Sequence, residues 1–379
     1  MNNKNALIAM LVLAALLFSL FTISVASEEI FSVSAKAAVL YEPETESILY
    51  AKRQNERMPM ASTTKIMTAL VAIENGRLDE VVTVDSRAVG IEGSSAYLKE
   101  GDRLTLEDLL YALMLGSAND AAVAIACAIS GEVDSFVSLM NEKALALGLS
   151  DTHFDNPNGL DSDTHYTSAH DLAIISACAL KNETFKKIVS TYKKSVVSGS
   201  FERLFVNHNK LLKLYDSAVG VKTGYTKKSG RCLVGSAERD GLSLISVTLD
   251  APSDWQDHAR MLDYGFDTLE RRAFAEPGQY SFELPVLGSD TATARVENTF
   301  GAYGILPKGA PETVEHIKLM RYLVAPVKRG DILGSVIFTV GGEEVASVDL
   351  VASEDVPIKE RRSKILEFFD KLKNKKDNG

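Results

Sequence analysis

The chain has few cysteines, and their spacing excludes two kinds of site. Only three occur in 379 residues, at Cys127, Cys178 and Cys232. No Cys-x-x-Cys pair is present, so neither a redox dithiol nor a zinc knuckle is supported. The odd number also argues against a disulfide framework. Cys127 and Cys178 lie in stretches rich in Ala, Ile and Leu, where we expect them to be buried apolar residues.

Other absences remove further classes of protein. No Gly-x-Ser-x-Gly elbow is present, which disfavours a Ser-His-Asp hydrolase. None of the six histidines starts a His-Glu-x-x-His pair, which disfavours a zinc peptidase. The formal net charge is −10, from 41 Lys and Arg against 51 Asp and Glu. A nucleic-acid partner would call for a basic surface and is therefore not supported.

Residues 1–26 are predicted to be an export signal. Lys4 supplies the positive start, Ala6–Phe21 is almost wholly apolar, and a Ser-Val-Ala cleavage site ends at Ala26. The apolar run falls short of the roughly 20 residues that a membrane span needs. We therefore expect cleavage after Ala26 and an exported protein. A retained transmembrane anchor is the alternative.

The apolar pattern of residues 27–273 predicts an α/β (α+β) domain. Strands are predicted at Ala37–Leu40, Ser47–Tyr50, Val219–Thr223, Cys232–Glu238 and Leu242–Leu249. Helices are predicted over Ala61–Asn75, twice within Leu106–Ile129, and over Val133–Leu147, Ser168–Leu180 and Trp255–Glu270. Strands at both ends with helices between them favour an antiparallel sheet with a helical lobe.

Two further regions follow. Short alternating strands from Gln279 to Val351 predict a small all-β domain, assigned to residues 274–353. Residues 354–379 are predicted to hold an amphipathic C-terminal helix, whose apolar face carries Ile365, Leu366, Phe368, Phe369 and Leu372. Basic residues flank this stripe, which favours a helix lying on an anionic membrane surface. A terminal helix packed on its own domain is the alternative.

A serine and a lysine lie at the start of the helix predicted over Ala61–Asn75. Ser62 and Lys65 are three residues apart, which places them on one face of a helix. A serine hydroxyl is a weak nucleophile until a base takes its proton. A lysine can be that base when burial and a second cation lower its pKa. Alone the pair is weak evidence, because a serine helix cap followed by a solvated lysine gives the same pattern.

Two other segments carry matching residue types. In the polar turn Gly116–Asp120, Ser117 could relay a proton to a leaving amine, and Asn119 could hydrogen-bond a substrate backbone. An ordinary turn between helices would look the same. Lys222, Thr223 and Gly224 follow an apolar strand and could supply the second cation, a carboxylate-binding hydroxyl and backbone access for a substrate strand. A simple strand end is the alternative.

Together and in this order, the three segments match the motifs of penicillin-recognising serine acyl-enzymes. From about Ala37 to Glu270 the chain resembles the low-molecular-mass penicillin-binding proteins, specifically the serine D-Ala-D-Ala carboxypeptidases. Beyond the motifs, the likeness includes Pro59–Leu70, Gly101-Asp102, Leu109–Tyr111, Ser117–Ala122, Asn156–Asp161, His165–Thr167, Asn209–Leu212 and Gly220–Thr226. The β-rich second domain and the basic C-terminal segment also match what such enzymes carry.

The resemblance implies a penicillin-recognising serine-transferase fold, without a metal or organic cofactor. It implies removal of the terminal D-Ala from peptidoglycan stem pentapeptides in the cell-wall space, with β-lactam antibiotics as covalent inhibitors. The implied roles are Ser62 as nucleophile, Lys65 as general base, Ser117 and Asn119 as the second wall of the cleft, Lys222, Thr223 and Gly224 as its strand side, and the backbone N–H groups of Ser62 and Tyr225 as the oxyanion hole.

The chain departs from this family pattern at two positions and in one segment. Asn158 stands where many relatives have His, and Tyr225 where some have His, which bears on deacylation and on pH dependence. No Arg lies between Asp250 and Asp257, where some relatives place a carboxylate-binding Arg. What holds the terminal carboxylate besides Thr223 is therefore left open.

Three related activities compete with the carboxypeptidase interpretation. A class A β-lactamase needs a Glu that activates the deacylating water, and no Glu-x-x-Leu-Asn occurs. A peptidoglycan DD-endopeptidase would use the same residues as a carboxypeptidase. A non-catalytic penicillin or wall-fragment sensor would acylate at Ser62 and stay acylated. The last two remain alternatives.

Overall fold

The computed structural model describes residues 31–199 and 201–359. The elements below all belong to the unit Ala35–Gly379. The predicted export signal lies outside the described residues. So does most of the predicted C-terminal helix, and its described part, residues 354–359, contains no helix.

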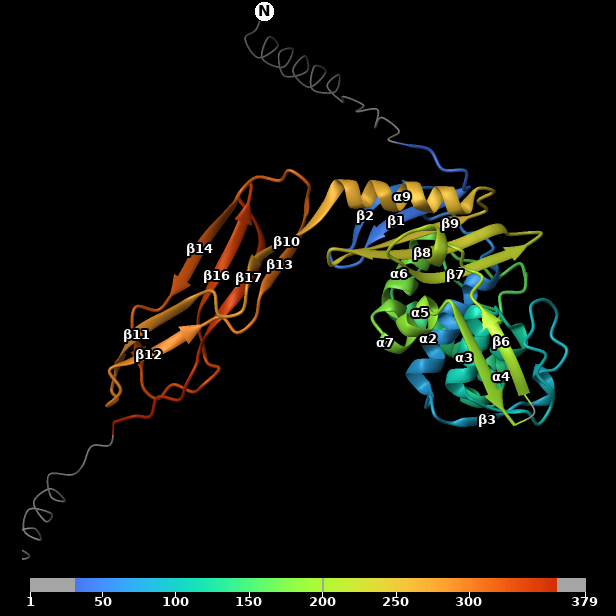
Figure 1. The fold of residues 1–379 in the computed structure, drawn as a ribbon, viewed down its shortest axis with the longest axis horizontal. Coiled ribbons are helices and arrows are strands. Elements are labelled where there is room, and N and C mark those ends of the chain that lie inside the picture. Colours follow the sequence, from blue (N-terminus) through green and yellow to red (C-terminus); the bar gives the residue numbers. More distant parts are fainter. Residues whose placement is uncertain (1–30, 200, 360–379) are drawn as a thin grey trace, which may run out of the picture. The chain divides into compact units, whose positions relative to one another are not determined.

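A five-stranded antiparallel sheet forms the framework of the first region (Figure 1). Its order is β2-β1-β9-β8-β7. The strands are β1 (Ala37–Glu42), β2 (Ser47–Lys52), β7 (Ala218–Thr226), β8 (Gly230–Arg239) and β9 (Leu242–Leu249). All five predicted strands are confirmed, and four of them run further than predicted because their polar ends continue the ladder beyond the apolar stretch.

Helices cover both faces of this sheet and form a lobe beside it. They are α2 (Lys65–Asn75), α3 (Leu106–Leu115), α4 (Asn119–Ser130), α5 (Val133–Ala146), α6 (Ala169–Leu180), α7 (Glu183–Ser190), α8 (Leu211–Leu214) and α9 (Asp254–Thr268). Figure 1 shows α9 on one face of the sheet and α6 on the other. The predicted α/β class with an antiparallel sheet and a helical lobe is confirmed.

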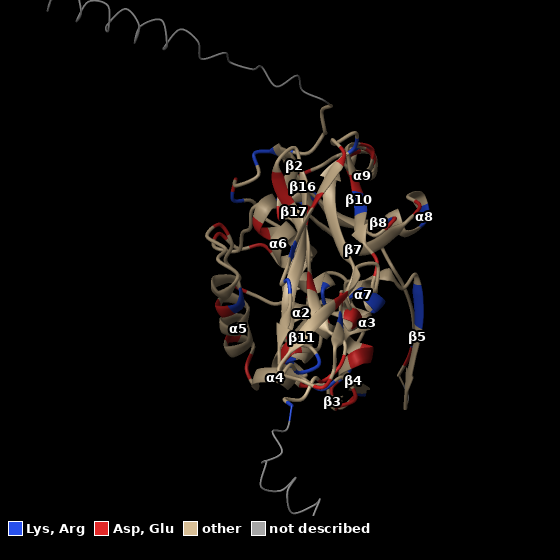
Figure 2. Ribbon diagram, turned by 90° about the vertical axis from the view of Figure 1, so that its left-hand side faces the viewer, with Lys and Arg blue, Asp and Glu red and all other residues tan. Residues whose placement is uncertain are grey.

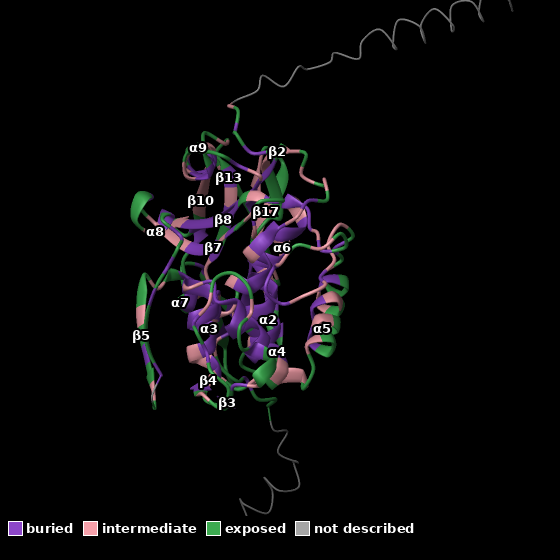
Figure 3. Cartoon of the chain, turned by 90° about the vertical axis from the view of Figure 1, so that its right-hand side faces the viewer, coloured by how far each residue is buried: buried purple, intermediate pink, exposed green. Residues whose placement is uncertain are grey.

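The helix α2 runs through the centre of this lobe. Its first two turns, Lys65–Ala72, are buried on every side, as expected for a helix without a polar face. Figure 3 shows α2 enclosed by its neighbours, whereas α5 presents an exposed side. In the described part of the chain no single helix has the length and apolar composition to cross a membrane, and α4 with α5 passes only as a pair bent by 87°.

Several short elements were not predicted from the sequence. They are the 3₁₀ helices η1 (Ala61–Thr64) and η2 (Ser86–Ala88), and the hairpins β3 (Val81–Thr83) with β4 (Arg103–Thr105) and β5 (Lys193–Ser198) with β6 (Phe201–Val206). The hairpin strands are short or largely exposed, so their sequences lack the apolar alternation that marks a strand. Helix α7 was also missed.

The second region is all β, as predicted. Its strands are β10 (Leu269–Ala275), β11 (Ser281–Leu287), β12 (Thr293–Glu297), β13 (Ala302–Pro307), β14 (Thr313–Leu319), β15 (Leu323–Val324), β16 (Ile332–Val340) and β17 (Glu343–Ala352). Six of them form a sheet in the order β14-β16-β17-β12-β11-β15, and β10 pairs with β13. A separate apolar cluster around Phe274, Tyr280 and Phe338 fills its core. The boundary predicted at residue 274 falls inside β10.

Acidic and basic residues are interspersed along the described chain (Figure 2). The helix α2 and the centre of the sheet carry few of them. Charged residues that are nevertheless buried therefore stand out, and two of these are Lys65 and Lys222.

Candidate active site

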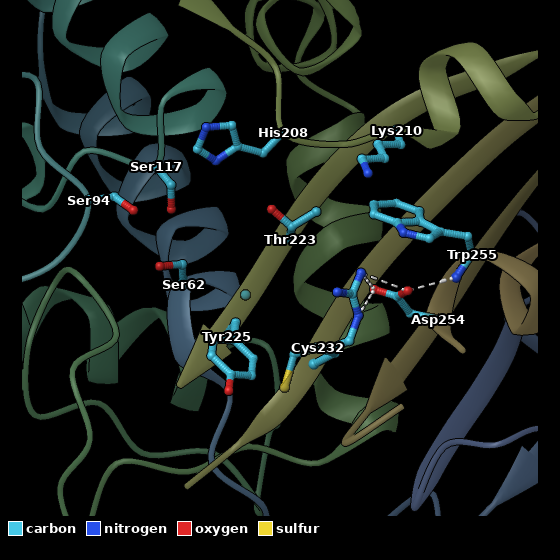
Figure 4. A pocket seen from close by; sticks show the side chains of 12 residues that line it. Ser62, Ser94, Ser117, His208, Lys210, Thr223, Tyr225, Cys232, Asp254 and Trp255 are labelled. Carbon is cyan, nitrogen blue, oxygen red and sulfur yellow. Dashed lines mark hydrogen bonds and ion pairs between the residues drawn. The ribbon is translucent and has the colours of Figure 1, made fainter. Parts of the chain in front are cut away.

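An open pocket of about 360 Å³ lies between the helical lobe and the edge strand β7. The predicted site residues Ser62, Ser117, Thr223, Gly224 and Tyr225 line it. Figure 4 shows Ser62, Ser117 and Thr223 facing the same hollow. Three segments more than fifty residues apart in sequence thus meet at one place.

The pair of Ser62 and Lys65 has the geometry of a nucleophile and its base. Ser62 lies in the single 3₁₀ turn η1, and Lys65 is the first residue of α2. The Lys65 Nζ is 3.0 Å from the Ser62 Oγ. Lys65 is fully buried. Burial lowers its pKa well below the usual 10.5, the positive charge of Lys222 lowers it further, and Asp120 raises it.

The other contacts of Lys65 orient its amine. Its Nζ donates to the Asn119 Oδ1 at 2.6 Å and to the backbone carbonyl of Asn158. A neutral amine has two N–H donors and one lone pair. These two acceptors use both donors, so the lone pair of neutral Lys65 faces the Ser62 hydroxyl. This is the arrangement in which Lys65 can take the Ser62 proton.

Asn119 lies behind the pocket. Its Oδ1 accepts from Lys65, and its Nδ2 donates to the Glu92 carbonyl at 2.5 Å. Asn119 is 5% exposed and is not among the pocket-lining residues. In this structure Asn119 holds Lys65, and its contact with a substrate backbone stays a prediction.

Lys222 is the second buried cation. It is 1% exposed, and its Nζ donates to the Thr223 carbonyl at 2.9 Å. Among the described residues no carboxylate forms an ion pair with it. Burial lowers its pKa to about 7. Because Lys222 also lowers the pKa of Lys65, the predicted coupling between the two lysines has a physical basis here.

Two residues beside the pocket have left-handed backbone conformations. Ala61, directly before the nucleophile, has φ +48°, and Ser117 has φ +56°. Such conformations cost non-glycine residues about 1–3 kcal/mol each and persist only where their surroundings enforce them. Ser117 is 4% exposed, and its hydroxyl makes no hydrogen bond within the described part of the chain. It is therefore available to a ligand.

Two glycines let backbone segments approach the nucleophile turn. A Cβ on Gly224 would lie 3.0 Å from both the Met60 carbonyl oxygen and the Ser62 nitrogen. A Cβ on Gly159, where φ is +90°, would overlap the Ala61 carbonyl. The close approach at Gly224 is thus to the turn that carries Ser62, in addition to any substrate strand.

A buried histidine fixes the same turn. The His165 Nδ1 accepts from the Asp155 N–H at 3.0 Å, so its Nε2 carries the proton and donates to the Thr64 Oγ1 at 2.7 Å. Thr64 in turn donates to the Ala61 carbonyl. Burial lowers the pKa of His165 to about 4. His165 therefore stays neutral and structural at neutral pH.

The pocket also contains residues that sequence reasoning did not select. These are Ser94, His208, Lys210, Arg231, Cys232, Asp254 and Trp255. Burial raises the pKa of Cys232 to about 11, which keeps it a thiol. Contrary to expectation, Cys127 and Cys178 are only partly buried, and Cys232 is the buried cysteine of the three. The strand pairing of β7 with β8 is the signal that could have identified Arg231.

Comparison with known proteins gives a consistent result. Residues 23–253 match the family described as D-alanyl-D-alanine carboxypeptidase, and residues 286–357 match the penicillin-binding protein 5 C-terminal domain. The D-alanyl-D-alanine carboxypeptidase DacF of Bacillus subtilis is 34% identical over 333 residues, which is 85% of this chain and 86% of that protein. DacA of Escherichia coli is 29% identical over 356 residues, covering 89% and 87%.

Two solved structures are also similar, one over most of the chain and one over a smaller part. The crystal structure of penicillin-binding protein 5 from Haemophilus influenzae has a TM-score of 0.65 and 30% identity, covering 86% of this chain and 98% of that one. A mutant of the Streptomyces K15 DD-transpeptidase has a TM-score of 0.59 and 35% identity, covering 62% and 99%.

Proposed function

The chain belongs to the D-alanyl-D-alanine carboxypeptidase family, and we propose that it is a serine-type enzyme that removes the terminal D-Ala from peptidoglycan stem pentapeptides through an acyl-enzyme on Ser62. The observation that carries the proposal is the 3.0 Å contact between the Ser62 Oγ and the fully buried Lys65 amine. That contact supplies a nucleophile and a base whose pKa burial has lowered.

The proposed acylation follows from this geometry. Lys65 takes the proton of the Ser62 hydroxyl as its oxygen attacks the carbonyl of the penultimate D-Ala. The C–N bond to the terminal D-Ala then breaks. The leaving amine receives the proton that Lys65 took up, and the Ser117 hydroxyl relays it. This hydroxyl has no other partner among the described residues. The proposed oxyanion-hole donors are the backbone N–H groups of Ser62 and Tyr225. Removing one such donor typically raises the activation barrier by about 3–4 kcal/mol.

The remaining site residues act on position and charge. Asn119 holds Lys65, and Lys222 disfavours its protonated form. Thr223 and Gly224 lie along the strand side, where an extended peptide would add to the edge of β7. Water then hydrolyses the acyl-enzyme and frees Ser62. We also propose β-lactams as covalent inhibitors, export through residues 1–26, and membrane-surface binding through residues 354–379.

The test is mass spectrometry of the protein with benzylpenicillin, combined with D-Ala release from a pentapeptide. We expect one adduct on the wild type, none on Ser62→Ala, and multiple turnovers of D-Ala release. An adduct on Ser62→Ala would refute the nucleophile. Stoichiometric labelling without turnover would identify a sensor instead, and faster cleavage of cross-linked dimers than of pentapeptide would identify an endopeptidase.

A further inference from the structure

A D-Ala-D-Ala peptide ends in a free carboxylate, and a carboxypeptidase has to bind that group. The segment 250–257 leading into α9 contains no arginine or lysine. Thr223 can offer one neutral hydroxyl. A charged partner for the carboxylate must therefore come from another segment that lines the pocket.

The register of the edge hairpin places Arg231 beside Thr223. Tyr225 on β7 pairs with Arg231 on β8. Directly opposed residues share a face of a sheet, and so do residues two apart on one strand, so Thr223 and Arg231 lie on the same face. They are diagonal neighbours, roughly 7–8 Å apart at their Cβ atoms, which an arginine side chain spans easily. Both line the pocket that contains Ser62.

A buried carboxylate holds the Arg231 guanidinium in place. Its Nε and Nη2 donate to Asp254, the first residue of α9, at 2.8–3.0 Å. The Asp254 side chain is 4% exposed and that of Arg231 is 44% exposed. The guanidinium carbon lies 5.8 Å from the centroid of Trp255. Figure 4 shows the bonds that converge on Asp254.

The other end of the guanidinium remains available. Among the described residues, no side chain or carbonyl accepts a hydrogen bond from the Arg231 Nη1. Asp254 thus fixes one edge of the planar Arg231 guanidinium and leaves its other N–H groups free to bind a second carboxylate. Arginine is suited to such binding because its donors match two carboxylate oxygens. Prior fixation also reduces the conformational entropy that binding would cost.

We propose that Arg231 binds the carboxylate of the terminal D-alanine and, together with Thr223, sets the specificity for peptides with a free C-terminus. The inference deepens the proposed function and rests on it. Asp254 is the positioning residue. Lys210 is the other cation whose side chain lines the pocket, and it has no comparable anchor among the described residues.

The test compares two ester substrates that differ only at the carboxylate. Acyl-D-Ala-D-lactate ends in a carboxylate, and acyl-D-Ala-D-lactamide ends in a neutral amide. For Arg231→Gln we expect kcat/KM for the lactate ester to fall about 30- to 100-fold, the range for losing a charge-assisted hydrogen bond. The lactamide ester should react as it does with the wild type. Arg231→Lys should recover part of the loss.

Arg239→Gln is the matched control, since Arg239 is on the same strand and packs over Phe266 of α9 at 4.4 Å. It should leave the ratio of the two substrates unchanged. Complete labelling by benzylpenicillin at long times checks that each variant is folded.

Equal losses of Arg231→Gln on both esters would make the Arg231–Asp254 pair structural only and overturn the inference. So would a selective loss in Lys210→Gln without one in Arg231→Gln. A wild type that releases no D-Ala would refute the proposed function, whereas D-Ala release with an unchanged ester ratio in Arg231→Gln refutes the inference alone.

Discussion

The two sides of the pocket use polar residues in different ways. On the helix side, Lys65 and Asn119 are buried and bonded to each other. On the strand side, Thr223 is partly exposed and the Arg231 side chain is 44% exposed. A lysine that acts as a general base needs a low-dielectric surrounding to lose its proton, whereas a group that recognises a substrate must be reachable. We therefore expect helix-side variants to lose the chemical step and strand-side variants to lose substrate selection.

The largest effect is expected for Lys65→Met, which keeps the side-chain volume and removes the base. Acylation by benzylpenicillin should slow by about 10³- to 10⁴-fold, the upper range for general acid–base catalysis. The rate constant of adduct formation, followed by mass spectrometry after rapid quenching, measures it.

Lys143→Met serves as the control for Lys65→Met. Lys143 lies on α5 and pairs with Glu74 at 2.6 Å, outside the pocket. This variant should acylate at the wild-type rate. Acylation of Lys65→Met within about tenfold of the wild type would place the base elsewhere and remove the contrast between the two sides.

Lys222 is the exception to this division, because it belongs to a strand and is nevertheless buried. Its charge lowers the pKa of Lys65. The acylation rate should therefore fall at low pH, where Lys65 becomes protonated. It should fall again above about pH 7, where Lys222 loses its charge. Lys222→Met should acylate about 100-fold more slowly at pH 7. Its acid limb should shift to higher pH, since Lys65 then binds a proton more readily.

The pH profile of Lys222→Arg provides the complementary experiment. A guanidinium stays charged over the accessible range, so the decline above pH 7 should disappear while the acid limb stays below that of Lys222→Met. An acid limb in Lys222→Met that is unchanged from the wild type would mean that Lys222 does not lower the pKa of Lys65.

The sequence predicted the parts of the site that depend on local pattern. Lys65 begins a helix, and Lys222 and Thr223 lie in an apolar strand, so periodicity located these two elements, whereas the 3₁₀ turn that carries Ser62 was predicted as part of the helix. The bond from Lys65 to the Asn158 carbonyl joins residues 93 apart and depends on a loop without regular structure. No local pattern encodes such a contact.

Arg231 was missed for a different reason. The family pattern places a carboxylate-binding arginine in the segment 250–257, and this chain has none there. The predicted strands Val219–Thr223 and Cys232–Glu238 both stop short of the turn, whereas the observed hairpin of β7 and β8 continues to it and pairs Arg231 with Tyr225. The strand register, which motif comparison does not use, is therefore what identifies Arg231 as a pocket residue. The 3₁₀ turn at Ala61–Thr64 depends on packing by Gly159 and Gly224 and was not readable in this way.

The smallest effect is expected for Thr223→Val, which removes one hydroxyl from the strand side without changing its shape. The KM of acyl-D-Ala-D-lactate should rise about tenfold while kcat stays near the wild-type value, because a single hydrogen bond to a charged group is lost. Thr223→Ser, which restores the hydroxyl, should restore KM. If Thr223 and Arg231 bind the same carboxylate, the double variant with Arg231→Gln should lose less than the product of the two single losses. Independent losses would mean that the two residues bind different parts of the substrate. A fall in kcat alone would mean that Thr223 acts in the chemical step and not in substrate binding.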